Sequence, residues 1–424
     1  MAIELSDITF TDEADIVPVS GIEKIRNTGI ANTLAGDDII TGTGGKYSIF
    51  NSGTLNTADG NDIITGIHND PEEDTLFGYG IYNNSGTIDT GNGNDIITGI
   101  TQEGRGIETL IGYGIYNENG TIDTGDGNDI ITGRSENLGI SNPNGIINTG
   151  DGDDTITGTA ARWGITLGIA TILENIFLGS LDTGKGNDII TGTGLYGIEN
   201  HSGTFTTGDG NDIITGNGHD IITNLSNGYG IGISNQGPMD TGDGDDIITG
   251  TNIGVGAGLI NGSDISTGDG NDIITGMGGT GIYNVGIINT GNGADSIIAD
   301  GDSDGTGTGY GIYNYGGTIN TGNGDDSIVA NGGFKSAFNN SGSVFLGNGE
   351  DYIKGFGSGD FYGGDGNDTL ELTPGSYTIG IWDTTVTFTN GNQLMITSEF
   401  EKLIAGGTTH DFISFTEGQT ISVA

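Results

Sequence analysis

The chain contains no cysteine, and Lys and Arg together supply only 10 of its 424 residues. Without cysteine, neither disulfides nor thiolate metal sites can hold the fold together. Asp and Glu number 57, so the formal net charge is −47 at pH 7. Such a charge repels the phosphates of nucleic acids and anionic membrane surfaces, so we expect no nucleic-acid partner and no membrane insertion.

Long apolar segments are also missing from the sequence. No run approaches about 18 apolar residues, so no transmembrane helix is expected. The first residues, MAIELSDITFTDEAD, have neither a basic N-terminal end nor an apolar stretch, so a cleavable signal peptide is not expected either.

What the chain does have is glycine, at 87 positions, in a repeating pattern. The stretch TGDGNDIITG recurs at Thr124–Gly133, Thr207–Gly216 and Thr267–Gly276. We number the unit T-G-D-G-N-D-I-I-T as nine positions. Repeats of this kind bury a core only when successive copies stack. Position 6 is an Asp in 14 copies: Asp38, Asp62, Asp95, Asp129, Asp154, Asp188, Asp212, Asp220, Asp246, Asp272, Asp295, Asp326, Asp351 and Asp368.

A second signal, such as YGIYNNSGTID at Tyr79–Asp89, precedes most copies. Its Asn serves as a marker, and the marker lies 11 or 12 residues before the next position-6 Asp in all ten cases. The return distance varies from 12 to 23 residues. A solenoid coil with a stacked part of constant length and insertions at a corner explains this difference. The markers are Asn51, Asn83, Asn117, Asn142, Asn200, Asn235, Asn261, Asn284, Asn314 and Asn339.

The pattern predicts an all-β, right-handed parallel β-solenoid with three short strands per coil: DIITG, YGIYN and GTIDTG. Two adjacent Ile residues cannot both face one core, so one points inward and one outward. Outer Ile residues such as Ile63, Ile96 and Ile130 then form an apolar ladder, beside a second ladder of position-9 Thr residues. The marker Asn residues form either a buried amide ladder or solvent-facing turns.

Three segments follow from where the repeats begin and end. Residues 1–31 are expected to cap the solenoid, 32–372 to form it, and 373–424 to form a C-terminal β cap. The cap includes a hairpin around Asn390-Gly391. The polar insertions at His68–Phe77 and Thr101–Ile111 are expected to be corner loops.

The turn T-G-D-G-N-D carries the candidate chemistry. Glycines at positions 2 and 4 permit backbone angles that let several carbonyls converge, and the position-6 carboxylate points to the same place. Stacked carboxylates repel one another, and an oxygen-only cage suits Ca²⁺. The alternative is that GDGND is only a favourable β-turn. The candidate glycines are Gly91, Gly93, Gly125, Gly127, Gly242, Gly244, Gly364 and Gly366.

Residues 363–371 read GGDGNDTLE, and the other copies replace the first Gly by Thr. The pattern resembles the repeats-in-toxin, or hemolysin-type calcium-binding, family. The resemblance implies a parallel β-roll in which position-6 carboxylates and the carbonyls of positions 1 to 4 bind multiple Ca²⁺ ions. Family copies recur every nine residues. Here that spacing holds only near Asp351, Asp360 and Asp368, and roughly at Asp212–Asp220. We therefore expect calcium along one edge, and along two edges only near the C-terminal end.

These features predict a secreted, non-enzymatic calcium-binding protein that folds on Ca²⁺ outside the cell and self-associates as a surface component. The C-terminal DFISFTEGQTISVA resembles the uncleaved type I export signal of the family, and the alternative is a cap strand. A second hypothesis is an adhesin or ice-binding surface built on the Ile/Thr ladder. A third is a β-helical carbohydrate-active enzyme, which the four scattered His residues and the lack of HExxH disfavour.

Overall fold

The computed structural model describes residues 2–18, 23–69, 77–102, 111–170, 176–177, 179–222, 227–301, 309–332 and 336–424. Most of the two predicted corner loops, at 70–76 and 103–110, lies outside these residues. The chain divides into two compact units, 1–217 and 218–424, each described by itself below. The only helices in the described ranges are the 3₁₀ turns η1 (Leu5–Asp7) and η2 (Phe412–Ser414), and neither could cross a membrane.

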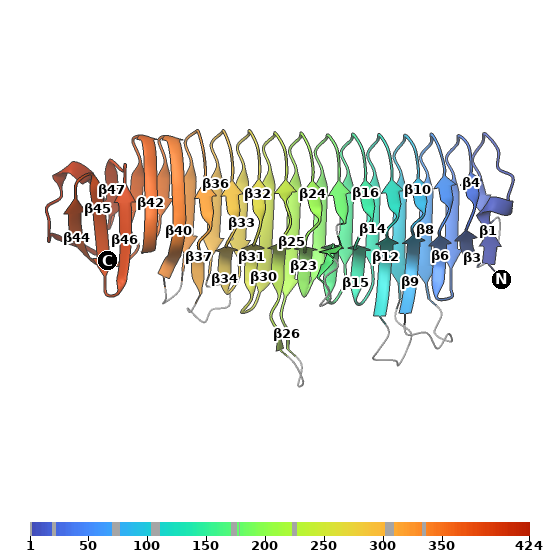
Figure 1. Ribbon diagram of the computed structural model, residues 1–424, viewed down its shortest axis with the longest axis horizontal. Helices are drawn as coiled ribbons and strands as arrows, with labels where there is room; N and C mark the ends of the chain where they lie inside the picture. The colour runs from blue at the N-terminus through green and yellow to red at the C-terminus, as the bar shows by residue number, and fades with distance from the viewer. Residues whose placement is uncertain are drawn as a thin grey trace. The chain divides into compact units, whose positions relative to one another are not determined.

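Each unit is a parallel β-solenoid whose coils contain three short strands, as predicted (Figure 1). One coil consists of β11 (Ile96–Thr101), β12 (Ile111–Glu118) and β13 (Thr121–Asp123). Each strand pairs in parallel with its counterpart in the next coil, and identical residues meet: Ile97 faces Ile131, and Thr98 faces Thr132. Because insertions sit between the strands, they leave this register unchanged.

In the first unit, the DIITG strands are β2 (Ile16–Val17), β5 (Ile39–Thr43), β8 (Ile63–His68), β11, β14 (Ile130–Arg134), β17 (Thr155–Thr159), β22 (Ile189–Gly194) and β25 (Ile213–His219). The YGIYN strands are β1 (Ala2–Glu4), β3 (Lys24–Asn27), β6 (Tyr47–Asn51), β9 (Phe77–Asn84), β12, β15 (Leu138–Asn142), β18 (Trp163–Leu167) and β23 (Tyr196–Asn200). The GTID strands are β4 (Ile30–Asn32), β7 (Thr54–Asn56), β10 (Thr87–Asp89), β13, β16 (Ile146–Asn148), β21 (Ser180–Asp182) and β24 (Thr204–Thr206).

In the second unit, the DIITG strands are β30 (Ile247–Ile253), β33 (Ile273–Met277), β36 (Ser296–Asp300), β39 (Ser327–Asn331), β41 (Tyr352–Lys354), β43 (Thr369–Glu371) and β47 (Lys402–Ala405). The other two faces consist of β28 (Ile231–Asn235), β29 (Met239–Asp240), β31 (Ala257–Asn261), β32 (Asp264–Ser266), β34 (Thr280–Asn284), β35 (Ile287–Asn289), β37 (Tyr310–Asn314), β38 (Thr318–Asn320), β40 (Ser336–Gly349) and β42 (Gly357–Gly366).

Columns of stacked aliphatic side chains form the core of each unit. Every strand of a coil contributes one inward residue, and the parallel register places it directly on its counterpart in the next coil. In the coil of β11 to β13 these are Ile97, Ile115 and Ile122, all with 0% exposure. Burying one such side chain stabilises the fold by about 1.5–3 kcal/mol, so the repeat supplies a core that no single coil has.

The Ile-Ile pairs divide between core and surface, as expected. Ile131 is fully buried, whereas its neighbour Ile130 is 40% exposed. The outer residues Ile63, Ile96 and Ile130 stack in register, and Thr65, Thr98 and Thr132 form the adjacent column.

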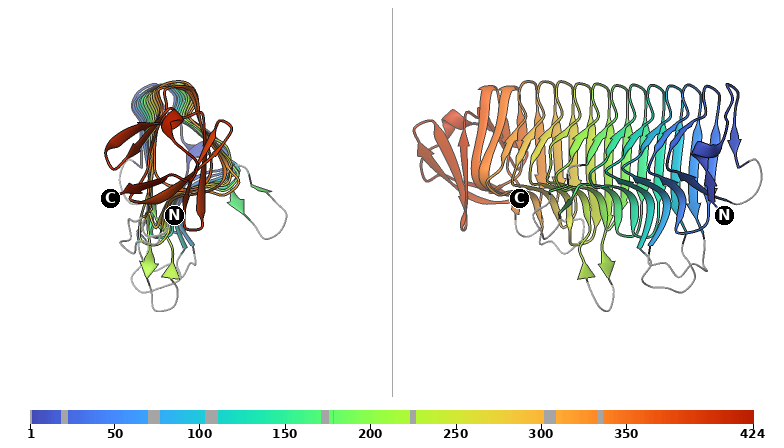
Figure 2. Two further views of the ribbon diagram at one scale, coloured as in Figure 1. Left: turned by 90° about the vertical axis from the view of Figure 1, so that its left-hand side faces the viewer. Right: turned by 45° about the vertical axis from the view of Figure 1, so that its right-hand side comes forward.

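Two short antiparallel hairpins leave the stacks of their own units (Figure 2). In the first unit, β19 (Ile169–Ala170) pairs with β20 (Ile176–Phe177). In the second unit, β26 (Ile221–Ile222) pairs with β27 (Asn227–Gly228). The second hairpin lies between β25 and β28, in the part of the repeat whose length varies, as the predicted corner loops do. The first lies between β18 and β21, in the part that was expected to be constant in length.

The two ends differ in how they cover the core. At the N-terminal end, β1 and β3 continue the parallel stack, so coil packing already begins within the predicted cap of residues 1–31. At the C-terminal end, β44 (Gly375–Trp382), β45 (Thr385–Asn390) and β46 (Gln393–Ser398) form an antiparallel meander that contains the predicted hairpin. Strands β48 (Thr408–Asp411) and β49 (Thr420–Val423) pair with β47 and β44, so the C-terminal stretch is part of the folded cap.

The division of each Ile-Ile pair has a measurable consequence. Ile97→Ala removes a buried side chain and should cost about 2–5 kcal/mol of stability, whereas Ile96→Ala on the outer ladder should cost about 1 kcal/mol or less. Thermal denaturation followed by circular dichroism compares the two variants. Equal losses would contradict the assigned faces.

Candidate metal site

The position-6 aspartates form one continuous column in each unit. The backbone N–H of each Asp donates to Oδ1 of the Asp in the next coil, as from Asp95 to Asp129 at 2.7 Å. The first unit contains six such bonds, joining Asp38, Asp62, Asp95, Asp129, Asp154, Asp188 and Asp212. The second unit contains five, joining Asp246, Asp272, Asp295, Asp326, Asp351 and Asp368. Thirteen of the 14 aspartates that the sequence assigned to position 6 therefore stack.

These carboxylates are almost completely inaccessible to solvent, with 0–1% exposure throughout the column. Burial raises the pKa of Asp129 to about 6 and that of Asp154 to about 7. The hydroxyl of the position-1 Thr, Thr124 or Thr149, reverses part of each pKa shift. In the structure the Thr124 hydroxyl donates to the carbonyl oxygen of Thr149, 3.4 Å away, which is a long hydrogen bond.

The second carboxylate oxygen, Oδ2, distinguishes this column from an ordinary hydrogen-bond ladder. Oδ1 of each acceptor is used by the backbone, whereas Oδ2 is buried and accepts no hydrogen bond in the structure. Burying a charged oxygen without a partner is costly, so each such atom needs an explanation. These Oδ2 atoms belong to Asp38, Asp62, Asp95, Asp129, Asp154, Asp188, Asp272, Asp295, Asp326, Asp351 and Asp368.

The turn glycines do more than adopt unusual backbone angles. Gly91 and Gly93 have φ of +80° and +147°, and Gly125 and Gly127 repeat these values within a few degrees. A Cβ at Gly127 would lie 1.6 Å from the carbonyl oxygen of Gly93, so successive turns are in direct contact. The same close approach occurs at Gly242, Gly244, Gly364 and Gly366, either to the preceding coil or from the following one. Any other residue at these positions would force the coils apart.

The donor set fits a hard divalent cation in part. Unpartnered carboxylate oxygens are ligands that Ca²⁺ prefers. Within the described ranges, however, no cluster of three or more His, Cys, Asp or Glu side chains could hold a metal. An ion beside the column would therefore share the Oδ2 atoms of successive coils and draw its other ligands from backbone oxygens or water.

Asp220 does not belong to the column, although the sequence pattern placed it there. It precedes the hairpin strand β26 instead of a solenoid strand. Its carboxylate accepts hydrogen bonds from the backbone N–H groups of Gly230 and Val255, at 2.7 and 2.9 Å. Asp360 lies within β42, paired with Ser343, so a second column of aspartates does not form there.

The marker asparagines form the buried ladder, not solvent-facing turns. Asn83 Nδ2 donates to Asn117 Oδ1 at 2.8 Å, and both side chains are fully buried. One predicted marker was wrong by one residue. The side chain of Asn340, not Asn339, accepts the hydrogen bond from Asn314, because Asn339 pairs with Tyr313 in the strand register.

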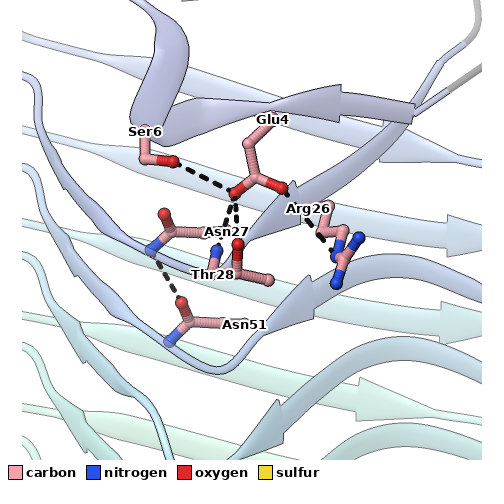
Figure 3. Close-up of polar contacts among 6 residues, drawn as sticks. All are labelled: Glu4, Ser6, Arg26, Asn27, Thr28 and Asn51. Carbon is pink, nitrogen blue, oxygen red and sulfur yellow. Dashed lines mark hydrogen bonds and ion pairs between the residues drawn. The ribbon is translucent and has the colours of Figure 1, made fainter.

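The first coil contains polar contacts that the repeat pattern could not reveal (Figure 3). Asn27 extends the Asn ladder by donating to Asn51 at 2.9 Å. Glu4 covers the start of the stack, because its Oε1 accepts from the backbone N–H of Thr28 at 2.7 Å and from the Ser6 hydroxyl at 3.2 Å. Arg26 lies 3.8 Å from the other carboxylate oxygen of Glu4.

Two residues outside the repeat complete the Asp columns. Asp15 N–H donates to Asp38 at the start of the first column, and Glu401 accepts from the N–H of Asp368 at the end of the second. Neither lies in a recognisable repeat copy, so only the stacking geometry identifies them.

Comparison of the chain with protein-family models and with curated protein sequences found no match. The assignment of the site therefore depends on its geometry and on the repeat itself.

The raised pKa values predict how stability depends on pH when divalent ions are removed. Ten of the column carboxyls have a folded pKa of about 6–7, above the unfolded value of about 3.9. The contribution of such a group to the free energy of unfolding is fully present below about pH 4 and is lost as the pH rises through the folded pKa. The melting temperature in EDTA should therefore fall between pH 5 and pH 8, and a constant value across this range would contradict the assignment.

A single substitution tests the charge itself. Asp129→Asn keeps an oxygen to accept from Asp95 and removes the buried charge. In EDTA at pH 8 it should stabilise the chain by about 3 kcal/mol. Asp126→Asn, at an exposed position of the same turn, is the matched control and should change stability little. Destabilisation by Asp129→Asn under these conditions would show that the charged form is favoured without metal.

Proposed function

We propose that this protein is a secreted, non-enzymatic calcium-binding β-solenoid, in which Ca²⁺ neutralises the buried Asp columns. The observation that carries the proposal is the column of buried Asp Oδ2 atoms that have no hydrogen-bond partner. The charge of −47 supports it, because a compact acidic chain repels itself unless cations bind. So does the resemblance of the turns to repeats-in-toxin sequences.

The energetic argument concerns ionisation at neutral pH. Raising a carboxyl pKa from 3.8 to about 7, as at Asp62, makes the charged form costlier by about 4 kcal/mol. A few such costs equal the whole stability of an ordinary domain, about 5–15 kcal/mol. The columns at neutral pH therefore require protons or cations, and cations are the available choice in a medium rich in calcium.

This requirement couples folding to the compartment. Metal binding that needs a folded site contributes directly to folding free energy. In a calcium-poor cytoplasm the chain would stay largely unfolded and suitable for export, and it would fold outside the cell at millimolar Ca²⁺. The proposed ligands are the Oδ2 atoms of successive aspartates, with one ion for each neighbouring pair.

Calcium titration of the purified chain at pH 7.5 tests the proposal. Strand content by circular dichroism and melting temperature should both rise with Ca²⁺, and equilibrium dialysis should count roughly one ion per hydrogen-bonded Asp pair. Mg²⁺ should substitute poorly, because it demands a smaller octahedral cage. Identical spectra and melting temperatures in EDTA and in calcium would refute the proposal.

Lateral self-association is the use that we propose for the outer face of the DIITG strands. In the first unit its central column is threonine in six successive coils: Thr41, Thr65, Thr98, Thr132, Thr157 and Thr191. The neighbouring column contains half-exposed isoleucines such as Ile130 and Ile189. This regular, uncharged strip contrasts with the acidic character of the chain and suits contact with a second copy.

Sedimentation in calcium provides the test of self-association. The wild-type chain should form dimers or larger assemblies that Thr98→Lys and Thr132→Lys disrupt, because two lysines would face the partner copy. Asp126→Lys, in an exposed turn of the same coil, controls for added charge. A strictly monomeric wild-type chain at high concentration would exclude this use of the face, and thermal hysteresis measurements would then test ice binding.

A further inference from the structure

The YGIYN face of the first unit contains two aromatic columns that stop abruptly. Tyr47, Tyr79 and Tyr113 stack with ring centroids 5.1 and 5.0 Å apart, and the last two rings lie within 6° of parallel. Tyr82 and Tyr116 form the adjacent column, 5.3 Å apart. In the next coil Leu138 replaces the tyrosine of the first column and Ser141 that of the second. The ring of Tyr113 therefore has an aromatic partner on one face only.

One coil further on, the first column becomes aromatic again. Trp163 follows Leu138 in register and stacks on Tyr196, with centroids 6.2 Å apart and planes within 12°. Its other face is thus directed back toward the coil of Leu138. The interruption leaves a pocket of about 400 Å³ between two aromatic side chains, Tyr113 and Trp163, with Leu138 in its wall.

Polar groups without partners line the same pocket. Ser141 and Thr166, which are adjacent in register, are only 1% and 4% exposed, yet neither hydroxyl has a hydrogen-bond partner in the structure. The Nδ1 atom of His201 is also buried and without a partner. Buried polar atoms are normally satisfied, so these three atoms in one pocket are free to bond a ligand placed there.

The pocket contains one ion pair, between Glu199 and His201, and one further cation, Arg162. Glu199 is 8% exposed, and its carboxylate lies 3.0 Å from His201 Nε2. This contact raises the pKa of His201, which favours the paired, protonated imidazole. Arg162 lies over the Trp163 ring, 5.7 Å from its centroid. Because the chain as a whole is strongly acidic, an anionic ligand is disfavoured at this pocket.

We propose that this pocket binds a neutral sugar residue. One face of a pyranose consists mainly of C–H bonds and packs on an aromatic ring, whereas its hydroxyl groups donate and accept hydrogen bonds around the rim. The aromatic side chains of Tyr113 and Trp163 match the first property. The hydroxyls of Ser141 and Thr166, which can both donate and accept, match the second. The site is independent of the Asp columns and of calcium coordination.

Tryptophan fluorescence measures binding directly. The chain has two tryptophans, and the other, Trp382, is 84% exposed in the second unit, so Trp382→Phe leaves Trp163 as the only reporter. This variant is titrated in calcium-containing buffer, after circular dichroism has verified its fold. The probes are short neutral oligosaccharides of glucose, mannose, galactose and xylose. At least one should cause a saturable change in emission.

Two variants separate recognition from folding. Thr166→Val removes one hydroxyl at nearly constant volume and should weaken binding about three- to tenfold. Leu138→Tyr continues the aromatic column, fills the pocket, and should abolish binding while the melting temperature stays the same or rises. Thr98→Val, on the DIITG face, is the matched control and should leave affinity unchanged.

Several results would overturn the proposal. One is the absence of saturable change with every sugar in a chain with native circular dichroism, which would mean that the pocket holds only water. Another is undiminished binding by Leu138→Tyr. Binding of adenosine in place of sugars would assign the pocket to a planar base. Binding of glucuronate alone, lost at high salt, would assign it to an anion held by Arg162.

Discussion

The hydrogen bond from the backbone of one position-6 Asp to the carboxylate of the next determines much of this structure. It connects successive coils at 2.7–2.9 Å and can form only if the coils stay in register. The direct contact between turn glycines imposes the same spacing. With the coils held this way, the inward residues of all three strands stack into columns, and the Asn ladder forms beside them.

The same arrangement creates the chemical problem that the proposed function answers. A carboxylate that satisfies a backbone N–H with one oxygen leaves the other oxygen in the interior. Repetition multiplies this cost along the column, and burial raises the pKa of each carboxyl toward neutrality. In acid, protonation removes the buried charge. At neutral pH, a divalent cation shared between neighbouring carboxylates would neutralise it. A neutral amide ladder, like that of the asparagines, carries no such cost.

The fold was predictable because the repeat has two independent signals at a nearly constant separation. The strands, the division of Ile96 from Ile97 and the stacking of the aspartates all follow from that periodicity. Asp220 was misassigned because its local sequence, HDIIT, resembles the repeat while its strand belongs to an inserted hairpin. Asn339 was predicted as the marker in place of Asn340 for a similar reason, since two adjacent Asn residues fit the same sequence pattern.

Other parts of the site lack any sequence signal. Glu4, Asp15 and Glu401 complete the ladders only because the chain ends fold against the terminal coils. The pocket beside Trp163 comes from a break in a column, and a break is visible only once the register is known.

Exchange of protons for calcium is the most direct test of the central claim. Calcium binding at about pH 5.5, measured by titration calorimetry in buffers with different heats of ionisation, reports the protons released per ion. Column carboxyls with folded pKa values of 6–7 are mostly protonated at that pH, and neighbouring ions share them, so each bound ion should release about one proton. Calcium binding with no proton release would show that the ions bind elsewhere and would contradict the account.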